Sequence, residues 1–145
     1  MVFGGMNLAA IVMAAVAAWL FGAVWYGVLA RPWVAAQGKT MEAFQAERAA
    51  QKGTPAAYLP FVIAFVAELA MAWILAGVLG HLGPGQVTLR NGVISALFIW
   101  VGFVLPVIAV NNMFGGRKPM LTVIDAGHWL AVLLVMGAVI GVIGA

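Results

Sequence analysis

The sequence predicts an all-α fold, an integral membrane four-helix bundle with a short interfacial or cytoplasmic helix in the first loop. Of the 145 residues, 66% are hydrophobic and only 8% are charged, too few charges to cover a water-soluble fold of this length. The apolar residues also gather into four runs of about 20 residues, the length that crosses a hydrocarbon core of about 30 Å. Lipid is therefore the expected surroundings of most of the surface.

We place the spans at residues 7–29, 58–80, 91–113 and 120–144, within one transmembrane domain that covers residues 1–145. Segments typical of helix ends and membrane interfaces bound the runs, namely 31–33, 53–55, 83–85 and 115–119. No Lys or Arg precedes the first run, and its apolar stretch is longer than that of a signal peptide. We therefore expect the first run to be retained as a span.

Basic residues mark one side of the membrane. The loop 30–57 and the loop before the last span carry Arg31, Lys39, Arg48, Lys52, Arg117 and Lys118, whereas the opposite side has only Arg90. The positive-inside rule predicts that both termini lie outside and that the two basic loops lie in the cytoplasm. The net charge of +3 is small and the basic residues lie in the connecting loops, so we expect no nucleic-acid partner.

The first loop is expected to contain one short helix. Thr40 suits an N-cap, Glu42 suits the first turn, and Gly53 suits the position just after the helix. Met41 and Phe44 give this helix a weak apolar side. Two interpretations stay open, a helix that rests on the membrane surface and a solvated connector.

Small residues predict where the spans pack together, since helices in lipid associate through close backbone approach. A ridge of Ala10, Ala14, Ala18 and Gly22 runs along the first span, and Gly137 and Gly141 form a GxxxG pair on the fourth. The glycine pair points nearly opposite to Asp125 and His128. We expect the Asp/His face inside the bundle and the glycine face against another helix of the chain or against a second copy.

Two further features concern the third span and the membrane interface. Pro106 is expected to bend the third span and free a carbonyl group. Trp25 and Trp33 lie near the predicted cytoplasmic interface, where an indole has one wet and one apolar edge. Trp100 lies deeper, where core packing is the simplest explanation.

Three ionisable residues lie inside the predicted spans, Glu68, Asp125 and His128. Counted from the cytoplasmic face, their depths are roughly 15 Å, 8 Å and 12 to 13 Å, in that order, at 1.5 Å per residue. Asn111 and Asn112 end the third span on the same side, and Tyr26 ends the first. We therefore predict one intramembrane polar cluster of Glu68, Asp125, His128, Asn111, Asn112 and Tyr26.

Several uses of such a cluster are open. Carboxylate and imidazole groups could pass protons, and Asp125 and His128, one helical turn apart, could contribute to a divalent metal site. The structural alternative is that Glu68 is protonated and hydrogen-bonded across helices, Asp125 caps or hydrates the start of the fourth span, and His128 bonds a neighbouring carbonyl. The chain has no cysteine, which excludes thiol chemistry and Cys-ligated metals. Without a convincing Ser–His arrangement either, an enzyme ranks last and no catalytic residue is assigned.

Two stretches carry a resemblance to a known family. Gly22–Tyr26 followed by Trp33 and Gly38, and Ile124–His128 leading to Met136–Gly141, resemble the Domain of Unknown Function 1761 family of small bacterial membrane proteins. The resemblance implies four spans and a bacterial inner-membrane location. It implies no activity, so no functional residue is carried over.

The chain departs from this family's pattern at three places. At residues 27–28 it has Gly-Val where the family usually has Ser-Pro, and at residues 30–32 it has Ala-Arg-Pro where the family usually has a Phe-Gly-Lys stretch. Asp125 stands where Asn is expected. The expected function is an oligomeric transporter or channel-like protein that uses the polar cluster; the alternative is a non-catalytic accessory subunit of a larger membrane complex. The expected partners are therefore the lipid bilayer and either further copies or foreign subunits, while the sequence names no cofactor, metal or substrate.

Overall fold

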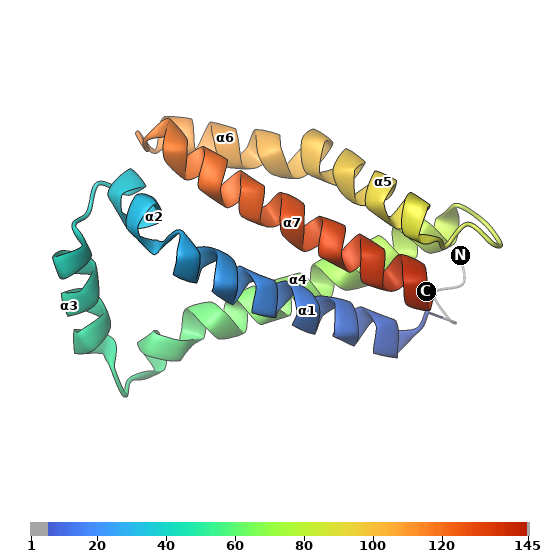
Figure 1. The fold of residues 1–145 in the computed structure, drawn as a ribbon, viewed down its shortest axis with the longest axis horizontal. Helices are drawn as coiled ribbons and strands as arrows, with labels where there is room; N and C mark the ends of the chain where they lie inside the picture. The colour runs from blue at the N-terminus through green and yellow to red at the C-terminus, as the bar shows by residue number, and fades with distance from the viewer. Residues whose placement is uncertain (1–5, 145) are drawn as a thin grey trace.

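In the part of the chain that the structure describes, four helical segments are long and apolar enough to cross a membrane. The structure is a computed structural model, which describes residues 6–144 and contains only helices and connecting loops, without a strand, over that range. The segments are α1 (Leu8–Val28), α4 (Pro55–His81), the continuous run Leu89–Phe114, and α7 (Pro119–Ile143) (Figure 1). The predicted all-α, four-span fold class is confirmed, and the chain is a multi-pass membrane protein.

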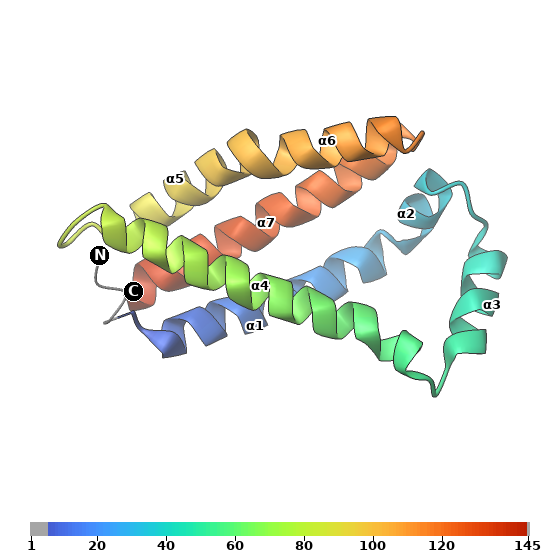
Figure 2. The ribbon, with the colours of Figure 1, turned by 180° about the vertical axis from the view of Figure 1, so that it is seen from behind.

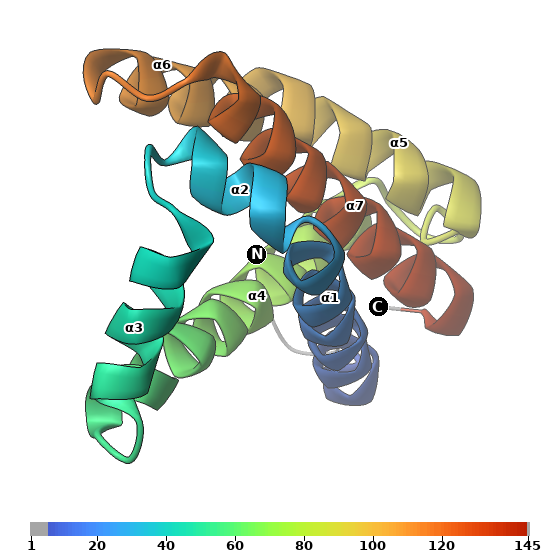
Figure 3. The same ribbon diagram turned by 60° about the vertical axis from the view of Figure 1, so that its left-hand side comes forward.

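The last helix, α7, lies at the centre of the arrangement. It contacts α1, α2, α4 and every part of the third span, and in Figure 3 it runs between α1 and the third span. Within the described residues, α1 has no contact with the third span. The position of the third span relative to α1 therefore depends on α7 and on α4, which also contacts both α1 and α5.

The core consists of small residues of α1 and α4 packed around larger ones of α7. Ala14 and Ala18 of α1 and Ala72 of α4 are fully buried, together with Val132 and Met136 of α7. Ala10 and Gly22 are buried on the same side of α1. The predicted ridge of small residues thus faces the interior of this chain, where it allows the helix backbones to approach.

The glycine pair of α7 contacts the third span of the same chain. A Cβ atom added to Gly137 would collide with the carbonyl oxygen of Gly92, and one added to Gly92 would collide with that of Gly137. A Cβ atom on Gly141 would collide with the carbonyl oxygen of Thr88. The sequence left open whether this pair contacts another helix of the chain or a second copy. In the structure it contacts a helix of the same chain.

The first loop contains two helices rather than one. The expected helix is α3 (Met41–Gln51), where the Thr40 hydroxyl oxygen accepts a hydrogen bond from the Ala43 N–H at 3.2 Å and Gly53 follows with a φ of 81°. The expectation of a single helix is wrong, because α2 (Ala30–Ala36) continues α1 after Leu29. Pro32 lies in the first turn of α2, where no backbone N–H is needed.

Helix α3 lies across one end of the bundle, against α2 and α4 (Figure 2). The Phe44 ring contacts the Trp33 ring at 5.9 Å, and the Arg48 guanidinium lies 5.4 Å from the centre of the Phe61 ring. The loop before α7 reaches the same end, where the Lys118 ammonium donates to the Ala35 carbonyl at 3.0 Å. We call this end, with loops 29–54 and 115–118, the basic end.

The third span changes its helix type in the middle. It begins as α5 (Leu89–Ile99), continues as a π-helical turn, η1 (Trp100–Val104), and ends as α6 (Leu105–Phe114). Pro106 lies in the first turn of α6, so it cannot donate the helical hydrogen bond to Gly102. The irregularity expected near Pro106 takes the form of this wider turn.

The glycine contact predicts a large effect of a side chain at Gly137. Gly137→Leu should lower the free energy of unfolding by about 3 kcal/mol, because backbone atoms of Gly92 occupy the space required. Denaturant titration in mixed micelles, followed by circular dichroism, measures this change. Gly80→Leu, at a helical glycine with nothing within 4 Å, is the control and should leave stability nearly unchanged. Equal stabilities of the two variants would contradict the packing.

Candidate functional site

Two segments far apart in the sequence, 22–26 and 124–128, lie against each other where α1 meets α7. A Cβ atom on Gly22 would lie 2.8 Å from His128 Nε2, and one on Gly127 would lie 3.2 Å from the Trp25 ring. Each glycine therefore leaves room for a large side chain of the other helix. This mutual fit sets the register between α1 and α7.

Three indole N–H groups donate to three successive residues of α7. Trp25 of α1 donates to the Ile124 carbonyl at 3.2 Å. Trp33 of α2 donates to Asp125 Oδ1 at 3.1 Å, and Trp100 of η1 donates to the Ala126 carbonyl at 2.7 Å. An N–H group without an acceptor is costly in hydrocarbon. These bonds therefore hold one turn of α7 from three sides.

Asp125 is the centre of a small polar group. Its Oδ1 atom accepts hydrogen bonds from the Tyr26 hydroxyl at 2.9 Å and from the Trp33 indole at 3.1 Å. The Tyr26 ring lies 5.3 Å from the Trp33 ring and 4.8 Å from the His128 ring, measured between centroids. We call Tyr26, Trp33, Asp125 and His128 the Asp125 cluster. No Lys or Arg of the described chain forms an ion pair with Asp125.

His128 is the deepest member of this cluster and is 4% exposed. Its ring contacts the rings of both Tyr26 and Trp129, with a centroid distance of 4.9 Å to Trp129. Its Nδ1 atom has no hydrogen-bond partner. Buried ring nitrogens are normally paired, so this atom is an unused donor or acceptor inside the protein.

Glu68 lies at the middle of a membrane span. It is thirteen residues from either end of α4 (Pro55–His81) and is 2% exposed. Its Oε2 atom has no hydrogen-bond partner. The next buried residues along α4 are Ala72 and Leu75, so this carboxyl group lies beside the apolar core.

The helix register separates Glu68 from His128. His128 is level with Gly22 of α1, while the Phe65 ring contacts the Trp19 ring with centroids 6.2 Å apart. Along α1, Trp19 lies three residues farther from the basic end than Gly22. Along α4, Glu68 lies three residues farther from that end than Phe65, which gives six residues in total. At 1.5 Å per residue, Glu68 lies about 9 Å farther from the basic end than His128. The structure thus joins Tyr26, Asp125 and His128, while Glu68 lies deeper.

The two asparagines of the predicted cluster lie on α6. Asn112 donates from Nδ2 to the Thr122 hydroxyl oxygen at 3.1 Å, which connects α6 to α7. Asn111 is exposed, and its backbone carbonyl accepts from the Gly115 N–H at 2.9 Å at the helix end. Neither side chain is hydrogen-bonded to the Asp125 cluster.

Within residues 6–144, no three His, Asp or Glu side chains are grouped as metal ligands would be.

Sequence reasoning missed Trp33 and Trp100 as members of this region. It assigned Trp33 to the membrane interface and Trp100 to core packing, whereas both donate hydrogen bonds to α7. The available signal was chemical, because an indole N–H inside a span needs an acceptor. Which carbonyl or carboxylate accepts depends on the register between helices, which the sequence pattern does not contain.

The shared acceptor on Asp125 predicts non-additive effects. Tyr26→Phe and Trp33→Phe should each lower the free energy of unfolding by about 1–3 kcal/mol. The double variant should lose more than the sum, because only then has Oδ1 lost both donors. A double-mutant cycle by denaturant titration measures this coupling. Tyr58→Phe, at the other tyrosine of the chain, is the control; strict additivity would contradict the shared acceptor.

Comparison with known proteins agrees with the resemblance of the two motifs. A family model described as "Protein of unknown function (DUF1761)" matches residues 9–141, a range that includes both α1–α7 contact segments. A search of curated proteins and a search of solved structures each gave no match. Because the family match covers nearly the whole sequence, the chain belongs to the DUF1761 family.

Proposed function

We propose that the protein carries protons, alone or together with a small solute, across a bacterial inner membrane, and that Glu68 is the group that binds the proton. One observation carries this proposal: a carboxyl group at mid-span is 2% exposed and has an oxygen without a hydrogen-bond partner. Ionisable groups at this depth are costly and typically mark ion or proton pathways. Glu68 is therefore the first residue to test.

A proton on Glu68 would be coupled to the packing of the bundle. The charged carboxylate is strongly disfavoured beside the apolar core, whereas the neutral acid is tolerated. Ala72 and Leu75 beside it contact residues of α1 and α7 in one core. Loss of the proton would therefore favour an arrangement of α1, α4 and α7 in which water or a solute reaches the carboxyl group.

The Asp125 cluster would connect Glu68 with one side of the membrane. His128 and Asp125 lie between the level of Glu68 and the basic end, and His128 has a free Nδ1 atom in the interior. Imidazole accepts and donates protons near neutral pH. With the basic end in the cytoplasm, as the positive-inside rule predicts, this series of groups would exchange protons with the cytoplasm.

The part of the bundle between Glu68 and the end opposite the basic end favours an oligomer as the functional form of the protein. On the α4 face that continues from Glu68, the buried residues are Ala72, Leu75, Ala76 and Leu79, all apolar. A proton released toward the outside therefore requires helix movement or an interface with a second copy. Small four-span proteins can build such a route by pairing protomers.

Liposome assays test this proposal directly. Purified protein is reconstituted into vesicles that contain a pH-sensitive dye, and a potassium diffusion potential drives proton entry. The wild type should acidify the lumen well above the rate of protein-free vesicles, and Glu68→Gln should abolish this flux, because the amide does not titrate as a carboxyl group does. Both proteins must be folded and incorporated to equal extents.

Glu42→Gln is the matched control, since Glu42 lies exposed on α3 outside the spans. It should transport like the wild type. Flux that persists unchanged in Glu68→Gln would remove Glu68 from the mechanism. A wild-type protein that passes no protons, and instead purifies with foreign subunits in native mass measurement, would contradict transport and favour the accessory role.

A further inference from the structure

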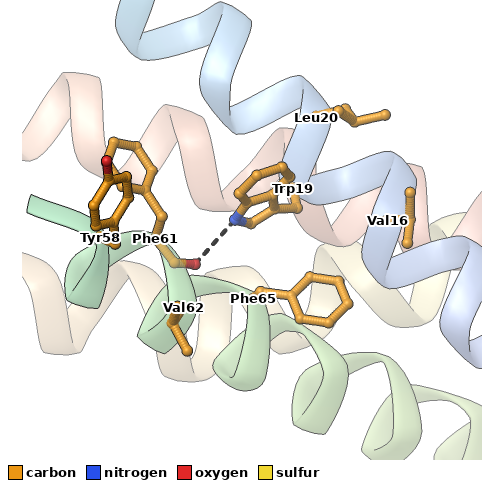
Figure 4. A pocket seen from close by; sticks show the side chains of 7 residues that line it. All are labelled: Val16, Trp19, Leu20, Tyr58, Phe61, Val62 and Phe65. Carbon is orange, nitrogen blue, oxygen red and sulfur yellow. Dashed lines mark hydrogen bonds between the residues drawn. The ribbon is translucent and has the colours of Figure 1, made fainter. Parts of the chain in front are cut away.

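We infer that the groove between α1 and α4 is a binding site for an anionic phospholipid, with an acyl chain in the groove and the phosphate group beside Arg48. Seven residues line the groove: Val16, Trp19 and Leu20 of α1, and Tyr58, Phe61, Val62 and Phe65 of α4 (Figure 4). Its volume is about 420 Å³, within the range of small-molecule sites. The inference does not depend on the proposed transport function.

The groove has the chemistry of a hydrocarbon site. Its lining is apolar except for the tips of Tyr58 and Trp19, and the Trp19 N–H is bonded across the groove to the Phe61 carbonyl at 3.1 Å. This bond removes the polar hydrogen that would otherwise need a partner in lipid. A flexible apolar chain therefore fits the lining better than a polar solute does.

The groove follows the direction of a lipid chain. Tyr58 lies in the first turns of α4 at the basic end, and Phe65 lies seven residues farther along the helix, a rise of about 10 Å. Phe65 is one turn from Glu68, the middle of the span. The groove thus extends from the membrane interface to about half its depth, as an acyl chain of one leaflet does. A transmembrane helix of a partner protein would need a groove along the full span.

A cation that forms no ion pair with a carboxylate of the described chain lies at the interfacial part of the groove. The Arg48 guanidinium lies 5.4 Å from the centre of the Phe61 ring, and Phe61 lines the groove. Among residues 6–144 the carboxylate of Glu47 forms an ion pair with Lys39 at 2.7 Å, but no carboxylate pairs with Arg48. A guanidinium binds a phosphate through paired hydrogen bonds, and Lys52 nearby in the sequence adds positive charge. The expected lipid is therefore anionic.

Native mass spectrometry of the purified protein tests this site. The protein in mild detergent is titrated with phosphatidylglycerol and, separately, with phosphatidylcholine of the same chains. The wild type should bind the first phosphatidylglycerol about fivefold more tightly than phosphatidylcholine, the effect of about one favourable cation at a lipid headgroup. Arg48→Gln should abolish this preference, and Val62→Trp should weaken binding of both lipids by filling the groove.

Arg31→Gln is the matched control, because it removes one positive charge from the same end of the bundle but from α2. It should keep the wild-type preference. The inference is overturned if the wild type shows no preference, if Arg48→Gln keeps it, or if both Arg variants lose it equally through general surface charge. Arg48 is exposed on α3, so its substitution should leave helix content unchanged; circular dichroism checks this for every variant.

Discussion

Hydrogen-bond donors inside a bilayer must find acceptors on the protein, and this constraint positions the helices of the chain around α7. The indoles of Trp25, Trp33 and Trp100 approach from α1, α2 and the third span and donate to three successive residues of α7. Each bond fixes the height of a different element against the same turn. Since α1 has no contact with the third span in the described chain, these bonds and the glycine contacts of α7 relate the two sides of the bundle, together with the contacts of α4 with α1 and α5.

The same arrangement divides the polar interior into two sites with different chemistry. Asp125 is supported by two donors and surrounded by aromatic rings, which is typical of a group held in one geometry. Glu68 is buried at mid-span with an oxygen that has no hydrogen-bond partner, and ionisable groups at this depth typically belong to functional sites. The first site holds the helices together, while the second is where a change of protonation would alter their packing.

Residue spacing along single helices was enough to predict much of this fold. The four spans, the Thr40 cap and the opposite directions of the glycine pair and the Asp125 face follow from composition and the helical period. The features that were missed require relations between helices. Depths counted along single helices predicted that Glu68 lies near His128. The contact between Phe65 and Trp19 instead indicates that Glu68 lies about 9 Å farther from the basic end than His128. The continuation of α1 into α2 was missed because Pro32 was taken as a helix stop, although proline is accepted in a first turn.

The register between α1 and α7 is the central claim, and the distance between the Tyr26 and His128 rings tests it most directly. The chain has two tyrosines and two histidines, so the variant Tyr58→Phe, His81→Gln retains one of each. In solid-state NMR of this variant in lipid bilayers, with tyrosine ring carbons and histidine ring nitrogens isotope-labelled, the account predicts a strong through-space signal between rings whose centroids are 4.8 Å apart. A folded, bilayer-embedded protein without that signal would contradict it.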